Sequence, residues 1–185
     1  MKRRVTTSHV IYSPPTPVVV AAPIAKAVVP ITIKSPLEIL GTSIAHNELL
    51  GNLYIVLKTK LKKSTFRIFF DKIRVKLTSG EFAFPDLIVC NPNPDKYFTA
   101  EPLLIVEIFS DTTRKTDLID KYLLYQQIKT LQYYLCIEPE KQFILFFFRD
   151  TEGDWQAQTL INEQDIVNLN KINVSFSLKE IYKAE

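Results

Sequence analysis

The stretch that decides the fold is Pro102-Leu-Leu-Ile-Val-Glu-Ile-Phe-Ser110, an almost wholly apolar run with one carboxylate inside it. Such a run is typical of a central β-strand that is covered on both faces. By alternation, Glu107 shares a face with Leu103, Ile105 and Phe109. An isolated charge on a buried face costs several kcal/mol or more. Glu107 is therefore expected to be paired, protonated or bound to a metal.

The patterns on either side of this run predict a mixed fold of the α/β (α+β) class, with a β-sheet flanked by helices. Helices are expected where apolar residues recur at helical spacing, and strands where they alternate or run together. The expected helices are about 43–61, 116–129 and 178–183. The expected strands are about 66–70, 72–77, 86–90, 102–110, 132–138, 142–149 and 155–160, with 132–138 and 142–149 forming a hairpin.

Composition predicts one globular domain over residues 36–185, preceded by a Pro-rich, basic arm over residues 1–35. The chain has 185 residues, of which 46% are apolar and 23% charged, enough to bury a core. The arm carries five bases and no acid, so the net positive charge of the chain comes from the arm.

Cys90 and Cys136 lie in apolar runs and are expected to be buried thiols. We expect a cytoplasmic protein without a membrane-spanning segment, since prolines and Lys26 interrupt the one apolar stretch near the start.

A second acid, Asp86, opens the short apolar run Leu-Ile-Val-Cys that ends at Cys90. If this strand neighbours the one that carries Glu107, both carboxylates can meet at the end of the sheet. Two carboxylates at one point repel each other unless a cation lies between them, and Mg²⁺ accepts one or two carboxylates while keeping several waters. The alternative is structural: Glu107 pairs with Arg114, Lys115 or Lys121, and Asp86 caps a turn.

These residues resemble the Uma-two family of bacterial restriction endonucleases, which belongs to the PD-(D/E)XK nuclease superfamily. The resemblance covers roughly residues 36–160. It is carried by an ordered set of motifs, namely Pro85-Asp86, Pro102 to Ser110 with Glu107, then Thr113, Asp117, Lys121 and Tyr125, then Leu131-Gln-Tyr-Tyr134, with Trp155, His46 and Asn52 also in place.

The resemblance implies roles for these residues. Asp86 and Glu107 would bind Mg²⁺ or Mn²⁺, with the Ile108 carbonyl as a third ligand. Phe109 occupies the position of the superfamily's usual lysine, and Lys121 on the following helix would replace that lysine. On a helix Asp117, Lys121 and Tyr125 lie on one face, so Lys121 either assists catalysis or pairs with Asp117.

The early helix adds two polar residues whose roles stay open. Glu48 is a candidate supporting acid, although a solvated helix residue explains it as well. His46 is expected to be a helix-surface or capping residue rather than a ligand.

The expected strand 72–77 places Lys72, Arg74 and Lys76 on one face. Such a row attracts DNA phosphates, but it also protects an edge strand from aggregation. The resemblance implies a metal-dependent endonuclease that acts on DNA. The alternatives are a nuclease fold that has lost catalysis and binds DNA or a partner, and an assembly protein. A homodimer is also expected, because the aromatic strand at 143–148 could form a subunit contact.

Overall fold

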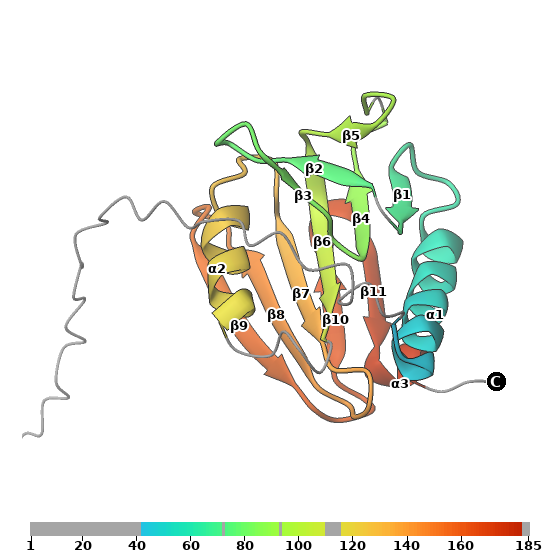
Figure 1. Ribbon diagram of the computed structural model, residues 1–185. Coiled ribbons are helices and arrows are strands. Elements are labelled where there is room, and N and C mark those ends of the chain that lie inside the picture. Colours follow the sequence, from blue (N-terminus) through green and yellow to red (C-terminus); the bar gives the residue numbers. More distant parts are fainter. Residues whose placement is uncertain (1–41, 72, 93, 110–115, 183–185) are drawn as a thin grey trace, which may run out of the picture. The chain divides into compact units, whose positions relative to one another are not determined.

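The computed structural model describes residues 42–71, 73–92, 94–109 and 116–182 (Figure 1). Two units divide the chain between Ile39 and Leu40, and the described residues belong to the second. The predicted arm at 1–35 lies outside the described residues and stays a prediction. Among the described residues, no helix has the length and apolar character needed to span a bilayer.

A six-stranded mixed sheet forms the centre of the domain, with the strand order β1-β4-β6-β7-β8-β9. Strands β6 and β7 are parallel, and every other neighbouring pair is antiparallel. The strands are β1 (Arg67–Phe70), β4 (Leu87–Cys90), β6 (Pro102–Ile108), β7 (Tyr133–Ile137), β8 (Ile144–Arg149) and β9 (Trp155–Leu160). The predicted mixed sheet and the hairpin at 132–149 are confirmed.

Three α-helices and two smaller sheets cover the central sheet. The helices are α1 (Ile44–Lys60), α2 (Thr116–Tyr125) and α3 (Leu178–Tyr182), with a short 3-10 helix at Asn170–Ile172. One small sheet has the order β3-β2-β5, and the other pairs β10 with β11. Their strands are β2 (Arg74–Lys76), β3 (Phe82–Ala83), β5 (Phe98–Thr99), β10 (Ile166–Leu169) and β11 (Val174–Ser177).

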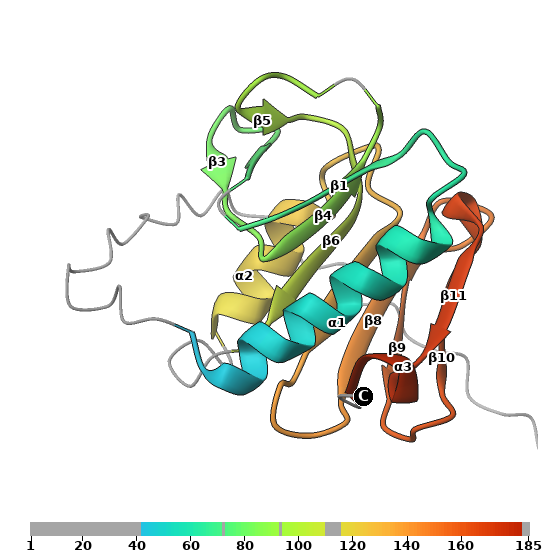
Figure 2. The ribbon, with the colours of Figure 1, turned by 90° about the vertical axis from the view of Figure 1, so that its right-hand side faces the viewer.

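Each face of the central sheet has its own apolar core. Leu49, Leu53 and Leu57 of α1 pack on one face, together with α3 and the β10–β11 pair, and Figure 2 shows α1 lying across this face. On the other face, Tyr125 at the end of α2 packs with Val75 of the small β3-β2-β5 sheet. Strand β6, between the two cores, is therefore buried on both sides, as its apolar run predicts.

Helix α1 begins at the place expected from its stripe of leucines, and Ser43 is its N-cap. The Ser43 hydroxyl accepts the amide N–H of His46 at 3.1 Å, which satisfies a donor in the first turn. Farther along, the Asn52 side chain donates to the Ile181 carbonyl at 3.1 Å. Asn52 therefore links α1 to α3 across 129 residues of chain.

The structure corrects three predictions about strands. Leu103 packs with the opposite core from Ile105, because a bulge between Val89 and Cys90 shifts the register. The strand expected at 72–77 is only Arg74–Lys76, and it belongs to the small sheet rather than the central one. The four short strands β3, β5, β10 and β11 were not predicted.

The aromatic run in β8 packs against both faces of the sheet, with Phe146 buried and Phe147 and Phe148 half-buried. Phe147 stacks on Tyr122 and on Tyr134, with ring centroids at 4.5 Å and 5.7 Å, whereas Phe146 points to the other face and stacks on Tyr133 at 6.0 Å. Strand β8 pairs with a strand on each edge, but Phe147 and Phe148 on its faces are only half-buried. The interpretation of this run as a subunit contact is therefore not tested, and a homodimer stays a prediction.

Arg149 holds the end of α2 against the sheet. Its three guanidinium nitrogens donate to three backbone carbonyls, those of Leu131 at 2.9 Å, Gly153 at 2.7 Å and Gln126 at 2.9 Å. The guanidinium also lies 4.7 Å from the centre of the Trp155 ring. One planar side chain therefore joins the turn after α2, the start of β7 and the β8–β9 turn.

Replacing this arginine tests how strongly α2 is anchored. In Arg149→Lys one ammonium cannot reach three separate carbonyls, so we expect the free energy of unfolding to fall by about 2 kcal/mol, measured by urea denaturation. Arg67→Lys on the edge strand β1 is the control, because Arg67 is exposed and should change little. Equal stability of Arg149→Lys and the unsubstituted protein would contradict the role of Arg149.

Candidate active site

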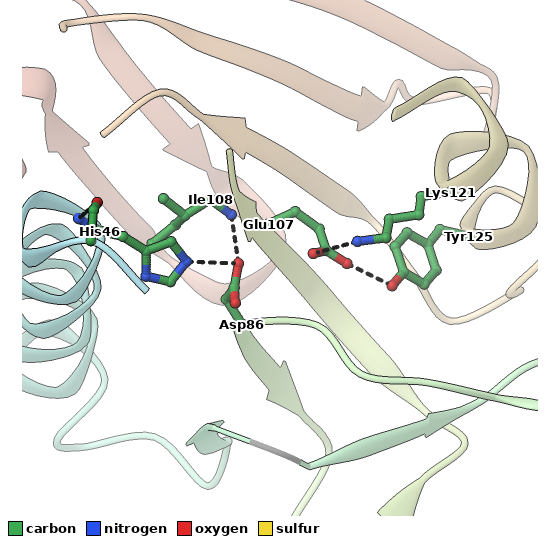
Figure 3. A network of polar contacts seen from close by, with 7 residues as sticks. His46, Asp86, Glu107, Ile108, Lys121 and Tyr125 are labelled. Atoms are coloured by element: carbon green, nitrogen blue, oxygen red, sulfur yellow. Dashed lines mark hydrogen bonds and ion pairs between the residues drawn. The ribbon is translucent and has the colours of Figure 1, made fainter. Parts of the chain in front are cut away.

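Glu107 lies on the face of β6 that α2 covers, and it is only 8% exposed. Its Oε2 lies 3.0 Å from the Lys121 ammonium, and its Oε1 accepts the Tyr125 hydroxyl at 2.8 Å. Both partners come from one face of α2, as their four-residue spacing predicts (Figure 3). The carboxylate expected from the sequence is therefore buried and held by two groups from a single helix.

The surroundings raise the pKa of Glu107 above its ordinary value. Burial is the largest cause, because it disfavours the charged form, and the negative charge of Asp86 acts in the same direction. Lys121 and the hydrogen bond from Tyr125 lower the pKa without cancelling the effect of burial. The ionised form of Glu107 is thus only partly compensated by the protein, which leaves a favourable place for a further positive charge.

Asp86 immediately precedes β4, next to the end of β6. Leu87 pairs with Val106 in the antiparallel register, which brings Asp86 opposite the Glu107 end of its neighbour. The Asp86 Oδ2 accepts the Ile108 amide N–H at 2.7 Å and lies 3.5 Å from the His46 Nε2. The predicted proximity of the two acid-bearing strands is confirmed.

The two carboxyl groups are directed at different partners. In Figure 3 the Asp86 group faces His46 and the Ile108 amide, whereas the Glu107 group faces Lys121 and Tyr125. Their charges nevertheless interact, since Asp86 contributes to the raised pKa of Glu107. No group of three or more His, Cys, Asp or Glu side chains suited to a metal occurs within the described part of the chain. The carboxylates of Asp86 and Glu107 are oxygen donors of the kind that Mg²⁺ accepts while it keeps several waters, and the His46 imidazole lies beside Asp86.

The remaining predicted site residues are distributed unevenly. Glu48 is exposed on α1, as expected for a solvated helix residue. Ile108 is buried at the end of β6, and its amide holds Asp86. The side chains of Asp117 and Lys72 lie outside the described residues, so the predicted pairing of Asp117 with Lys121 stays open.

His46 was expected to be a helix-surface or capping residue, and the prediction of a surface position is wrong, whereas its amide does take part in the cap with Ser43. The residue is 5% exposed, and its Nε2 faces the Asp86 carboxylate. Its Nδ1 has no hydrogen-bond partner among the described residues. The signal was present in the sequence, because His46 continues the buried stripe of Leu49, Leu53 and Leu57 at intervals of three and four residues.

A groove of about 440 Å³ borders Asp86 on the side of α1. His46 and Asp86 line it together with the aromatic residues Tyr54, Phe70 and Phe84. Phe70 and Phe84 are 46% and 62% exposed. Asp86 can therefore be reached by a molecule of moderate size from this side.

The arrangement of the sheet and its helices is shared with a solved nuclease-like structure. A crystal structure from Anabaena variabilis, described as "a putative nuclease belonging to DUF820", superposes with a TM-score of 0.64 over 76% of this chain and 81% of that chain. The sequence identity is 14%, so this likeness concerns the fold. The domain has a restriction-endonuclease-like fold.

The family follows from the sequence comparison. The model of the Uma2 family, described as "Putative restriction endonuclease", matches residues 36–179, which extends the expected resemblance beyond residue 160. This chain belongs to the Uma2 family.

Two curated relatives come from Synechocystis sp. (strain ATCC 27184 / PCC 6803 / Kazusa), and both are described as uncharacterized proteins. The protein slr1290 is 31% identical over 117 residues, which are 60% of this chain and 60% of that protein. The protein sll1609 is 26% identical over 133 residues, which are 69% of this chain and 75% of that protein.

The raised pKa of Glu107 predicts a pH-dependent gain in stability for Glu107→Gln, measured with a chelator present. Glutamine is neutral like the protonated acid, so the two proteins should be about equally stable below the ordinary pKa near 4.5. Above it the unfolded chain loses its proton while folded Glu107 retains it, so the unsubstituted protein loses stability until the pH passes the raised pKa. At pH 8 the variant should therefore be the more stable of the two proteins. A less stable variant at pH 8 would mean that Lys121 outweighs burial.

Proposed function

We propose that this protein is an endonuclease that hydrolyses phosphodiester bonds of DNA with Mg²⁺ or Mn²⁺ as the cofactor. The observation that supports this most is the buried Glu107 carboxylate, which contacts Lys121 and lies at the end of the sheet beside a second acid, Asp86. Membership of a family described as restriction endonucleases points to the same activity and to DNA as the substrate.

Asp86 and Glu107 are the residues that we propose to hold the metal, with the Ile108 carbonyl as a third donor. Oxygen donors of this kind suit Mg²⁺ and Mn²⁺. When bound, such an ion polarises a phosphoryl oxygen and lowers the pKa of a bound water. The incomplete compensation of the Glu107 charge by its neighbours favours the arrival of a cation.

Lys121 and Tyr125 are proposed to act on either side of the Glu107 carboxylate. Lys121 is about one-third exposed at its side chain, so its ammonium can face both Glu107 and a phosphate at the end of the sheet. There it would orient the attacking water or stabilise the negative charge on the phosphate. Tyr125 is buried and donates to Glu107, so it is a positioning residue.

DNA backbone contacts are proposed for Arg74 and Lys76, which lie on β2, and for Lys72, which precedes it. Phosphate contacts of this type make binding sensitive to salt. A homodimer in the cytoplasm would be consistent with this function, since restriction-type nucleases commonly act as dimers.

One observation favours a second candidate function, a nuclease fold that binds DNA or a partner without cutting. Phe109 replaces the lysine of the superfamily motif, and both oxygens of Glu107 are engaged by Lys121 and Tyr125. If Lys121 serves only to neutralise Glu107, metal-dependent cutting would be absent. Salt-sensitive DNA binding without cleavage would then remain.

Cleavage of supercoiled plasmid DNA in the presence of Mg²⁺ or Mn²⁺ separates the two functions. We expect Asp86→Asn, Glu107→Gln and Lys121→Met each to lower the cleavage rate by about 100-fold or more, because each removes a charge that acts on the metal or the phosphate. Gel electrophoresis of nicked and linear products gives the rates.

The controls for this experiment are Glu140→Gln and Lys129→Met, which remove one exposed acid and one exposed base outside the site. Both should cut like the unsubstituted protein. Identical rates for all six proteins would refute the proposed active site, and no cleavage by the unsubstituted protein would favour the binding module.

A further inference from the structure

The outer face of the small β3-β2-β5 sheet consists of alternating cations and aromatic rings. Strand pairing places Arg74 opposite Phe98 and Lys76 opposite Phe82. Residues that lie opposite each other in a sheet point to the same face, so these four side chains share one surface. The other face of the sheet is turned inward, since Val75 is fully buried within the core that α2 covers.

Each cation on this face also lies over a ring of the neighbouring pair. The Arg74 guanidinium is 4.9 Å from the centre of the Phe82 ring, and the Lys76 ammonium is 5.7 Å from that of Phe98. The two rings contact each other edge to face at 5.4 Å. The four side chains thus form a connected cation–aromatic surface, which we call the β2 platform (Arg74, Lys76, Phe82 and Phe98).

Exposed aromatic residues continue the platform in both directions. Tyr97, just before β5, is 58% exposed and lies 5.1 Å from the Lys96 ammonium. Phe84, just after β3, is 62% exposed and lines the same groove as Asp86. Figures 1 and 2 show the small sheet next to β4 and β6. Exposed rings therefore lie next to the platform in the chain on both sides, and one of them, Phe84, lines the groove beside Asp86.

The charges around the platform favour an anionic partner. The three strands contain no acid. The acids that flank these strands in the sequence are Asp71, Glu81, Asp86, Asp95 and Glu101. Among the described residues, no ion pair joins one of these acids to Arg74 or Lys76, although the Arg74 Nε donates to the Tyr97 carbonyl at 3.4 Å. The two cations can therefore meet phosphates, while the half-buried rings of Phe82 and Phe98 offer their exposed parts to bases.

We infer that the β2 platform binds an unpaired DNA strand and directs it to the groove beside Asp86. In a duplex the bases are stacked on one another, so their faces cannot reach Phe82 or Phe98, and only phosphate contacts remain. An unpaired strand offers phosphates and base faces together, and the guanidinium of Arg74 can itself stack on a base. The preferred substrate is therefore DNA with a single-stranded segment. The role of the bound strand as a substrate rests on the proposed endonuclease function, whereas the binding of the strand to the β2 platform does not.

The test is fluorescence anisotropy with a labelled oligothymidylate of about 15 nucleotides and with a duplex of the same length, in a chelator so that no cleavage occurs. We expect the protein to prefer the single strand. Phe82→Leu and Phe98→Leu keep an apolar side chain but lose the stacking surface, so each should weaken single-strand binding about tenfold and leave duplex binding unchanged. Lys76→Gln should reduce the salt dependence for both probes.

The matched control is Phe143→Leu, because Lys141 lies 5.8 Å from the Phe143 ring in a similar cation–aromatic pair. This variant should bind like the unsubstituted protein, and thermal unfolding checks that all variants are folded.

Three binding results would overturn the inference. They are unchanged single-strand binding by Phe82→Leu and Phe98→Leu, an equal loss of binding in Phe143→Leu, and a preference of the protein for the duplex. A dimer in light scattering that Phe82→Leu dissociates would also overturn it, since the platform would then bind a second copy. If the protein binds the single strand but does not cleave the plasmid, the proposed endonuclease function is contradicted and the inference about the platform is not.

Discussion

The Glu107 carboxylate lies inside an apolar face of the central strand, and its contacts with Lys121 and Tyr125 tie β6 to α2. A buried charge without these contacts would cost several kcal/mol, so the position of α2 and the presence of Glu107 depend on each other. Burial still raises the pKa of Glu107 despite both contacts. The neighbours of Glu107 therefore compensate its negative charge only in part. Incomplete compensation of this kind is expected where a site binds a cation.

The helices on both faces of the central sheet hold the surroundings of Glu107 and Asp86 in position. Arg149 anchors the turn after α2 through three backbone carbonyls, which fixes the helix that carries Lys121 and Tyr125. On the opposite face, α1 brings the buried His46 to Asp86. Both acids thus project from a rigid sheet between packed helices, and rigid support of this kind is what precise ligand placement needs.

The burial of Glu107 could be predicted because this residue breaks an otherwise apolar run, and a break of this kind is visible without a structure. The α2 spacing of Lys121 and Tyr125 was equally readable. The burial of His46 was missed although its spacing from Leu49 places it on the buried stripe of α1, because it stands at the end of that stripe, in the first turn of the helix. The platform around Phe82 and Phe98 could not be predicted, because strands of two or three residues show no periodicity and their pairing joins segments distant in the sequence.

The most direct test of the account is the anomalous density of crystals soaked in Mn²⁺. The account predicts one peak at the end of β6, with oxygens of Asp86 and Glu107 at about 2.1 Å, the distance that Mg²⁺ also adopts. Crystals of Glu107→Gln should lack the peak. A map without a peak at this place, in which Glu107 is neutralised by Lys121 and Tyr125 alone, would contradict the account and leave the carboxylate with a structural role.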